Sequence, residues 1–258
     1  TALTKIGSSA FYGCTEITGT VVLPANLKII NSYAFENCNK VDAFDFTQCT
    51  QLTSIGYKAF AECTKITEVN LPASLETIDA SAFADCANLT TLTVDAASTH
   101  LRSKNNIIYD YNETKLLCRA PNVASVTFPA TLTEIAEGVF TNCTGLTQVN
   151  FSQCTGLTTI GESAFYGCTG LTSVDLSGCT SLTTINVAAF VFCTNAEIKL
   201  PESITSIDYY SFGFIHDNGT EYYCKKDLIK KGPEFERIKA LVTGDPCNYP
   251  ADRVGEYE

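Results

Sequence analysis

The sequence predicts a repeat solenoid in which each coil of the chain adds one short strand to a parallel sheet. The motif Ala-Phe-x-x-Cys-Thr-x-Leu-Thr-x-Val-x-Leu recurs along the chain and is complete at residues 164–176. Its phenylalanines return at nearly constant spacing, and its Val and Leu positions alternate with polar ones, as in a half-buried strand. These observations favour one elongated array over two globular domains.

The repeat phenylalanines fix the length of a coil. They follow one another at steps of 22–25 residues, with a single longer step of 57 residues between Phe83 and Phe140 (140 − 83 = 57). The eight positions are Phe11, Phe35, Phe60, Phe83, Phe140, Phe165, Phe190 and Phe212.

Each coil is predicted to have one strand, a bend and a short turn segment. Residues 173–176 are a typical strand, and a proline turn such as Leu71-Pro72 ends the strand in the shorter coils because proline removes a backbone donor. Leu157 and Ile160 mark a second buried edge. The Ser-Ala-Phe-x-x-Cys segment has room only for a turn or two of α- or 3₁₀-helix, so we expect an α/β-type solenoid with an irregular convex side.

Most of the thirteen cysteines occupy repeat positions. Seven lie three residues after the repeat phenylalanine, and three more precede Thr-x-Leu-Thr at the bend. A thiol is small and readily buried, so we expect a reduced row of core thiols. Zinc is not expected, because no Cys-x-x-Cys pair exists.

The pattern resembles the BspA-like branch of the leucine-rich-repeat superfamily, with Ile-Gly-x-x-Ala-Phe-x-x-Cys-x-x-Leu-x-x-Val-x-Leu-Pro as the shared unit. Near-complete copies cover about residues 1–215. The resemblance implies a leucine-rich-repeat right-handed superhelix. It also implies extracellular or surface-anchored proteins of bacteria and some protists that bind host proteins or other cells.

Residues 95–122 depart from the pattern, since they lack the Ala-Phe-x-x-Cys unit. Residues 106–118 instead predict a strand, a polar turn and a second strand. One interpretation is an atypical coil with a protruding hairpin. The other is a recognition element, because projecting loops on rigid scaffolds often carry binding residues.

Residues 216–258 also lie outside the pattern. Pro233 precedes Phe235, Ile238 and Leu241 at helical spacing, and an array end needs a cap over its last apolar coil. We expect a cap here, with a tether to a further module or to the cell surface as the alternative. Outside the row of core thiols, Cys224 and Cys247 are the one pair for which we expect a disulfide.

Charge and hydropathy exclude several classes of partner. The net charge is −11, with 17 basic against 28 acidic residues, which disfavours nucleic acid and anionic membrane surfaces. No apolar run is long enough for a transmembrane segment. Leu3-Thr4-Lys5-Ile6-Gly7 matches residues 157–161, so residue 1 falls inside a repeat. We expect a fragment without its natural N-terminal cap or signal.

Catalysis is not expected. His100 and His216 are the only histidines, and neither lies in a recognisable nucleophile motif. Asp45, Glu68 and Asp175 occupy displayed strand positions on different coils, where a solvated acidic face is the simpler interpretation. No glycine-rich phosphate loop or calcium-binding repeat occurs, so we expect no cofactor and no metal.

Function is therefore sought among the side chains that an in-register parallel sheet would display. They form two polar columns with few aromatic or arginine anchors. The candidate partner-binding residues are Glu68, Asn70, Thr91, Thr93, Ser125, Thr127, Gln148, Asn150, Ser173 and Asp175.

Two functions fit this sequence. The first is a secreted or cell-surface interaction and adhesion module, a monomer that binds a protein or glycan partner through the strand face or the 95–122 unit. The second is a rigid structural spacer in a larger surface protein, with no ligand of its own.

Overall fold

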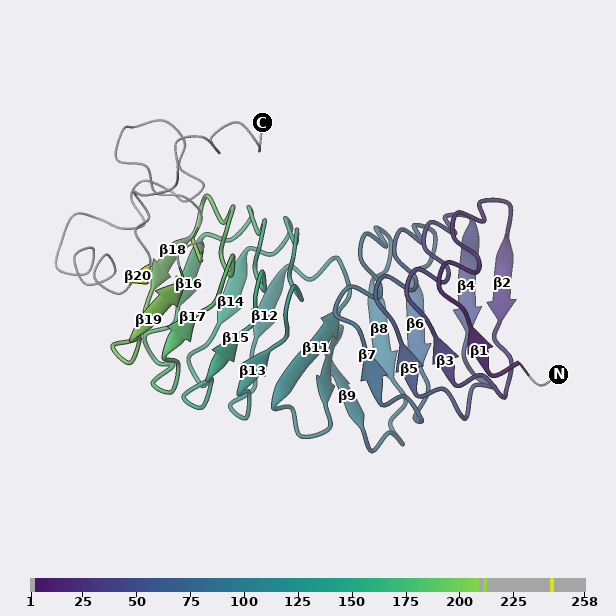
Figure 1. The fold of residues 1–258 in the computed structure, drawn as a ribbon, viewed down its shortest axis with the longest axis horizontal. Coiled ribbons are helices and arrows are strands. Elements are labelled where there is room, and N and C mark those ends of the chain that lie inside the picture. The colour runs from purple at the N-terminus through teal and green to yellow at the C-terminus, as the bar shows by residue number, and fades with distance from the viewer. Residues whose placement is uncertain (1–2, 209–210, 213–241, 244–258) are drawn as a thin grey trace.

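A computed structural model describes residues 3–208, 211–212 and 242–243. The chain forms a solenoid whose coils stack side by side along its long axis (Figure 1). Each regular coil has three sides: a longer strand, a two- or three-residue strand, and a turn segment around the repeat phenylalanine. Parallel pairing between neighbouring coils joins both kinds of strand.

The longer strands form the strand face. They are β2 (Gly19–Val22), β4 (Val41–Asp45), β6 (Glu68–Leu71), β8 (Thr91–Val94), β12 (Ser125–Thr127), β14 (Gln148–Asn150), β16 (Ser173–Asp175) and β18 (Glu197–Lys199). Their hydrogen bonds divide this face into three sheets, β2-β4, β6-β8 and β12-β14-β16-β18. The expectation of one continuous sheet is therefore wrong.

The second side of each coil also pairs, so the prediction of a single strand per coil is wrong. The isoleucines that marked a buried edge, such as Ile55 and Ile160, lie in a second set of strands, mostly of two residues, that bond to their neighbours. These strands are β1 (Lys5–Ile6), β3 (Ile29–Ile30), β5 (Ser54–Ile55), β7 (Thr77–Ile78), β11 (Lys115–Arg119), β13 (Glu134–Ile135), β15 (Thr159–Ile160), β17 (Thr184–Ile185), β19 (Ser206–Asp208) and β20 (Val242–Thr243).

The third side is not helical. We call the five residues centred on each repeat phenylalanine the rung. In the rung of Phe35, Tyr33 and Asn37 have φ of 60° and 59°, and in the rung of Phe60, Lys58 and Glu62 have φ of 50° and 57°. A left-handed residue on each side of the phenylalanine interrupts any right-handed helix. The described residues accordingly contain no helix, contrary to the expected helical turns.

This alternation aims N–H groups of the rung at the next coil, three of them in the rungs of Phe11, Phe35, Phe140 and Phe165. Tyr33, Phe35 and Asn37 donate to the carbonyl oxygens of Tyr57, Ala59 and Ala61 at 2.8, 2.8 and 2.9 Å. The rung is thus a third hydrogen-bonded column, made of turns. Such bonds satisfy the backbone of a segment that has neither helix nor strand partners.

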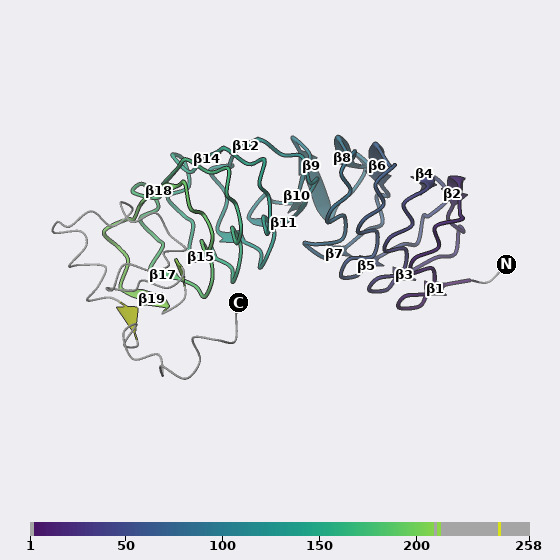
Figure 2. The ribbon, with the colours of Figure 1, turned by 90° about the horizontal axis from the view of Figure 1, so that it is seen from above.

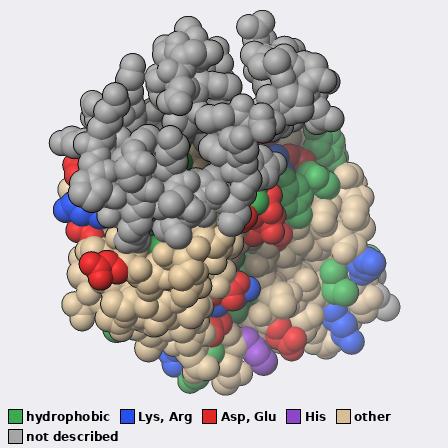
Figure 3. Space-filling view, turned by 60° about the vertical axis from the view of Figure 1, so that its left-hand side comes forward, with side chains coloured by type: hydrophobic (Ala, Val, Ile, Leu, Met, Phe, Trp, Pro, Cys, Tyr) green, Lys and Arg blue, Asp and Glu red, His purple; other side chains and the backbone are tan. Residues whose placement is uncertain are grey.

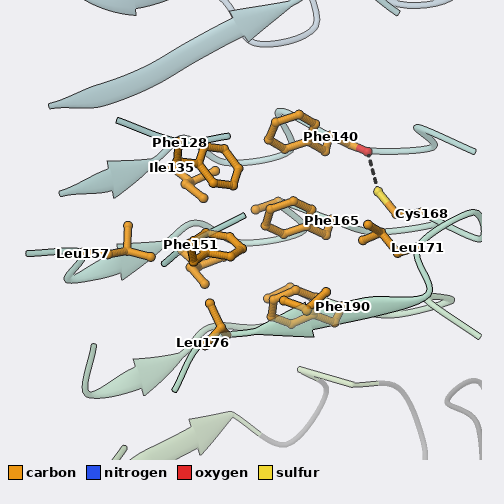
Figure 4. Close-up of a cluster of buried hydrophobic side chains, with 14 of the residues drawn as sticks. Phe128, Ile135, Phe140, Phe151, Leu157, Phe165, Cys168, Leu171, Leu176 and Phe190 are labelled. Atoms are coloured by element: carbon orange, nitrogen blue, oxygen red, sulfur yellow. Dashed lines mark hydrogen bonds between the residues drawn. The ribbon is translucent and has the colours of Figure 1, made fainter. Parts of the chain in front are cut away.

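Inside the rungs the phenylalanine rings stack along the array. Consecutive rings lie 5.0 to 5.8 Å apart and within 10° of parallel, from Phe11 to Phe83 and again from Phe140 to Phe212. Figure 4 shows three of these rings, with the bent chain around them. Leucines, isoleucines and valines from both strand columns complete two buried clusters.

Most of the cysteines that follow the repeat phenylalanines also form hydrogen bonds to the preceding coil. The thiol of Cys168 donates to the carbonyl oxygen of Phe140 at 3.0 Å, as Figure 4 shows. Cys63 and Cys193 bond in the same way to Phe35 and Phe165, at 3.2 and 3.1 Å. The eleven cysteines of the described region are free thiols. Cys224 and Cys247 lie outside that region, so their disulfide stays a prediction.

The 95–122 unit contains the predicted strand, turn and strand, but the hairpin does not protrude. β9 (Leu101–Lys104), β10 (Ile107–Asp110) and β11 form an antiparallel set, and β11 then pairs with β13 in parallel. Ile108 packs into the N-terminal core cluster, whereas Ile107 and Tyr109 pack into the C-terminal one. The unit is therefore a core wedge between two halves, and the array bends there (Figure 2).

The 95–122 unit lacks a rung, and we call the place where it joins the two halves the junction. Arg119, at the end of β11, supplies donors there to the rung of Phe140. Its Nε donates to the carbonyl of Val139 at 2.9 Å and a terminal nitrogen donates to that of Thr141 at 3.2 Å. In a regular rung these carbonyls would accept backbone N–H groups. The guanidinium also lies 5.7 Å from the centre of the Phe140 ring.

Past residue 212, the described part of the chain is the strand β20. It pairs in parallel with β19, so Val242 continues the column from Ile207. The remaining residues of the 216–258 segment, including His216, lie outside the described residues, and the cap stays a prediction.

The buried thiols predict that alkaline pH destabilises the fold. Burial raises the pKa of Cys49 and Cys154 to about 11, and that of Cys86, Cys118 and Cys179 to about 12, from an ordinary 9.0. Unfolded thiols ionise near pH 9 while folded ones stay protonated. Each such thiol should therefore lower the free energy of unfolding by about 1.4 kcal/mol per pH unit above pH 9.

Guanidinium unfolding under reducing conditions at a series of pH values measures this effect. We expect a plateau below pH 9 and a steep fall above it, with a shallower fall in Cys86→Ala. A free energy of unfolding that stays constant through this range would contradict the buried, protonated thiols.

Removing the arginine at the junction should destabilise the C-terminal half. Arg119→Ala leaves the Val139 and Thr141 carbonyls without donors and should cost about 2–4 kcal/mol in urea unfolding. Arg119→Lys should recover less than half, because an ammonium cannot reproduce the planar fork. The control is Arg102→Ala, which removes an exposed arginine that donates to the Tyr111 carbonyl. This variant should lose less than about 1 kcal/mol of unfolding free energy. A larger loss would contradict a special role for Arg119.

Candidate functional site

The strand face carries all ten predicted binding residues. Its two predicted columns are present in register: Glu68 lies beside Thr91, and Ser125, Gln148 and Ser173 follow one another. Thr91 and Thr93 are half-buried, and the other eight candidate side chains are exposed. The structure thus shows where these side chains lie, and their role in binding stays a prediction.

The breaks between the sheets divide the ten residues into two groups. Four lie on β6 and β8, and six lie on β12, β14 and β16. The 95–122 unit separates them, because side chains from that unit bond to the backbone of β8. The Leu92 N–H donates to Asn106 Oδ1 at 3.1 Å and the Val94 N–H donates to Ser103 Oγ at 3.0 Å.

Several residues of the second column serve the local fold as well as facing the solvent. Asp45, Asn150 and Asp175 each accept the N–H of the residue two positions on, at 2.8 to 3.0 Å. Such side-chain caps begin the bend that follows each strand. The pattern Asp/Asn-x-Ser/Thr at the end of a strand is present in the sequence and would have predicted these caps.

The caps also lower the pKa of two carboxylates. Hydrogen bonds from the Ser177 hydroxyl and N–H hold the pKa of Asp175 below its ordinary value, with Lys199 adding a smaller effect at 3.5 Å. The side chain and N–H of Thr47 act in the same way on the pKa of Asp45. Both groups are therefore anionic at neutral pH.

A hollow of about 540 Å³ opens on the strand face between the bends that follow β4 and β6. Ala43, Pro72 and Ala73 contribute accessible apolar surface to it, and the buried Phe44, Phe46 and Leu71 lie beneath. Its polar lining includes two predicted residues, Glu68 and Asn70, together with the carboxylates of Asp45 and Asp95. Neither lysine nor arginine lines this hollow.

Within the hollow, the carboxylates differ in the hydrogen bonds that they make to the rest of the protein. Asp45 and Asp95 cap the N–H groups of Thr47 and Ala97, both at 2.8 Å. Glu68 is exposed and forms no ion pair within the described part of the chain. The Thr93 hydroxyl bonds to Asn70 Oδ1 at 3.1 Å, which fixes the amide. The hollow is an acidic, partly apolar and preorganised surface.

Two other features, a metal site and a membrane-spanning helix, are not found among the described residues. His100 is exposed. Across the part of the chain that the structure covers, no three His, Cys, Asp or Glu side chains group closely enough to hold a metal ion. A helix able to cross a membrane is likewise not found among these residues.

Comparison with solved structures finds the same fold in bacterial proteins. A leucine-rich cell surface protein of Faecalibacterium prausnitzii aligns at 24% identity and a TM-score of 0.57, over 82% of this chain and 67% of that one. The pneumococcal vaccine antigen PcpA aligns at 20% identity and a TM-score of 0.51, over 76% of this chain and 60% of that one. Both likenesses establish the fold alone.

A leucine-rich-repeat protein of Eubacterium ventriosum is also similar, at 20% identity and a TM-score of 0.47 over 85% of this chain and 82% of that one. No curated protein matches the sequence. The model of the BspA type leucine-rich-repeat region matches residues 1–111 and 113–222 in six copies. The match spans most of the sequence, so the chain belongs to the BspA-type leucine-rich-repeat family.

Proposed function

We propose that this protein is a cell-surface or secreted interaction module whose strand face binds a protein partner. The hollow beside β4 and β6 carries the proposal, because it combines apolar surface with the carboxylates of Asp45, Glu68 and Asp95 and has no cation in its lining. This chemistry fits a lysine or arginine side chain whose aliphatic stem packs on Pro72 and Ala73. Membership of the BspA-type family and the likeness to a leucine-rich cell surface protein support a location at the cell surface or outside the cell.

The stiffness of the array also supports binding. Three hydrogen-bonded columns, interrupted at the sheet breaks and at the missing rung, join the coils. The displayed side chains therefore lose little conformational freedom when a partner binds. The 95–122 unit is less suited to recognition, since Ile107, Ile108 and Tyr109 on β10 are buried in the core. The proposed surface therefore excludes this strand.

The alternative function is a spacer that holds other modules apart. The same three columns favour it, because a stiff array transmits position without any ligand. The two functions differ in one respect that can be measured: only the first requires the side chains of the hollow.

A binding screen with matched variants tests the proposal. The intact chain would be tested against purified extracellular-matrix proteins and glycans, and the best binder would be measured again with Glu68→Gln, Asn70→Ala and the double variant. We expect about a fivefold loss for Glu68→Gln at low ionic strength, decreasing as salt is added.

The control is Glu197→Gln on β18, which removes a carboxylate from the same column, far from the hollow. It should leave binding unchanged. Equal losses for the two glutamates would indicate attraction by net charge alone. No binder, or a binder that neither hollow variant weakens, would favour the spacer.

A further inference from the structure

A second cleft lies where the rung is missing. It has a volume of about 490 Å³ and opens between the rungs of Phe83 and Phe140, on a different side of the coils from the strand face. The lining includes Tyr57, Asp79, Asp85, Arg119, Glu137 and Asn142. Figure 1 shows the turns of the two halves separated between β8 and β12, and Figure 3 shows acidic side chains along the crease between the nearer and farther parts.

The N-terminal wall of this cleft presents backbone donors without partners. In the rung before it, the Phe60 and Glu62 N–H groups donate to the carbonyls of Ala82 and Ala84, both at 2.9 Å. The corresponding N–H groups of Phe83 and Asp85 have no acceptor among the described residues. Asp85 has the left-handed φ of a rung, at 57°, whereas Ser81, on the other side of Phe83, does not, so the part of this rung that follows Phe83 keeps the regular conformation.

The C-terminal wall is only partly occupied. Arg119 donates hydrogen bonds to the carbonyls of Val139 and Thr141, but the carbonyl of Glu137 has no donor among the described residues. The equivalent carbonyl one coil on, that of Glu162, accepts the N–H of Gly138 at 2.9 Å. The cleft thus has backbone donors on one wall and a backbone acceptor on the other.

Charge selects among the extended peptides that could fill this gap. Asp79, Asp85 and Glu137 form no ion pair within the described region. The Arg119 guanidinium donates hydrogen bonds to four carbonyl oxygens and forms no ion pair with these carboxylates. Lys58, the other cation of the lining, faces Glu36 at 3.9 Å. Tyr57, 41% exposed, adds an aromatic surface at the rim.

The geometry points to a binding site for an extended, basic peptide of another protein, which completes the missing rung. Its carbonyl groups accept the N–H groups of Phe83 and Asp85, and one of its own N–H groups donates to the Glu137 carbonyl. Lysine or arginine side chains face Asp79, Asp85 and Glu137. Main-chain bonds thereby supply affinity and the carboxylates supply selectivity, as when a strand is added to a sheet edge.

The test uses a peptide that copies a rung. The probe has the sequence of residues 56–64, with serine in place of cysteine and lysine in place of glutamate, and carries a fluorophore. Fluorescence anisotropy with the full chain should show saturable binding. In NMR spectra the amide signals of Phe83 and Asp85 should shift on titration, and those of Phe60 and Phe165 should not.

Three protein variants separate this site from general attraction. Asp85→Asn combined with Glu137→Gln should weaken the probe about fivefold. Glu62→Gln combined with Glu162→Gln removes the matching carboxylates one coil away and should weaken it less than twofold. Ala84→Phe fills the cleft without changing net charge and should abolish binding, with the circular-dichroism spectrum unchanged.

Any of four results would overturn the proposal. One is equal binding of a scrambled peptide of the same composition, which would show attraction by charge alone. The second and third are binding that persists in Ala84→Phe and binding that leaves the Phe83 and Asp85 amides unshifted. Loss of binding in Glu68→Gln on the strand face would likewise place the probe elsewhere.

Discussion

The backbone bonding between successive rungs is the interaction on which the rest of this structure depends. A turn segment ordinarily leaves its N–H and C=O groups to water, yet here the core lies directly beneath it. In most rungs, left-handed residues on both sides of the repeat phenylalanine turn up to three N–H groups toward the next coil. The rings then stack at the spacing set by these bonds, and the rung thiols reach the phenylalanine carbonyls.

A column of this kind must end somewhere, and each end leaves donors or acceptors exposed. At the junction the two ends are treated differently. Arg119 covers most of the C-terminal end with one planar group, whereas the Phe83 end is left open. The strand face shows a similar contrast, since Asn106 and Ser103 cap β8 while the hollow beside β4 stays acidic and accessible. Both accessible surfaces lie where a hydrogen-bonded column is interrupted, at the break between β4 and β6 and at the missing rung.

The repeat motif predicted much of this fold because each of its apolar positions recurs in the same environment. Phe165, Cys168 and Val174 are buried as expected, and the displayed columns have the expected register. Left-handed φ could not be predicted, since Lys58, Glu62 and Ala188 adopt it without the glycine or asparagine that usually signals it. The sheet breaks and the role of Arg119 depend on long-range packing, which a motif of one coil does not contain.

Amide hydrogen exchange at the rung residues tests the account most directly. The Phe35, Phe60, Phe140 and Phe165 amides bond to the next coil and should exchange only through opening of the array, whereas the Phe83 amide faces the open cleft and should exchange much faster. Equal protection at Phe83 and Phe60 would contradict the interrupted column. Fast exchange at every rung would contradict the column itself.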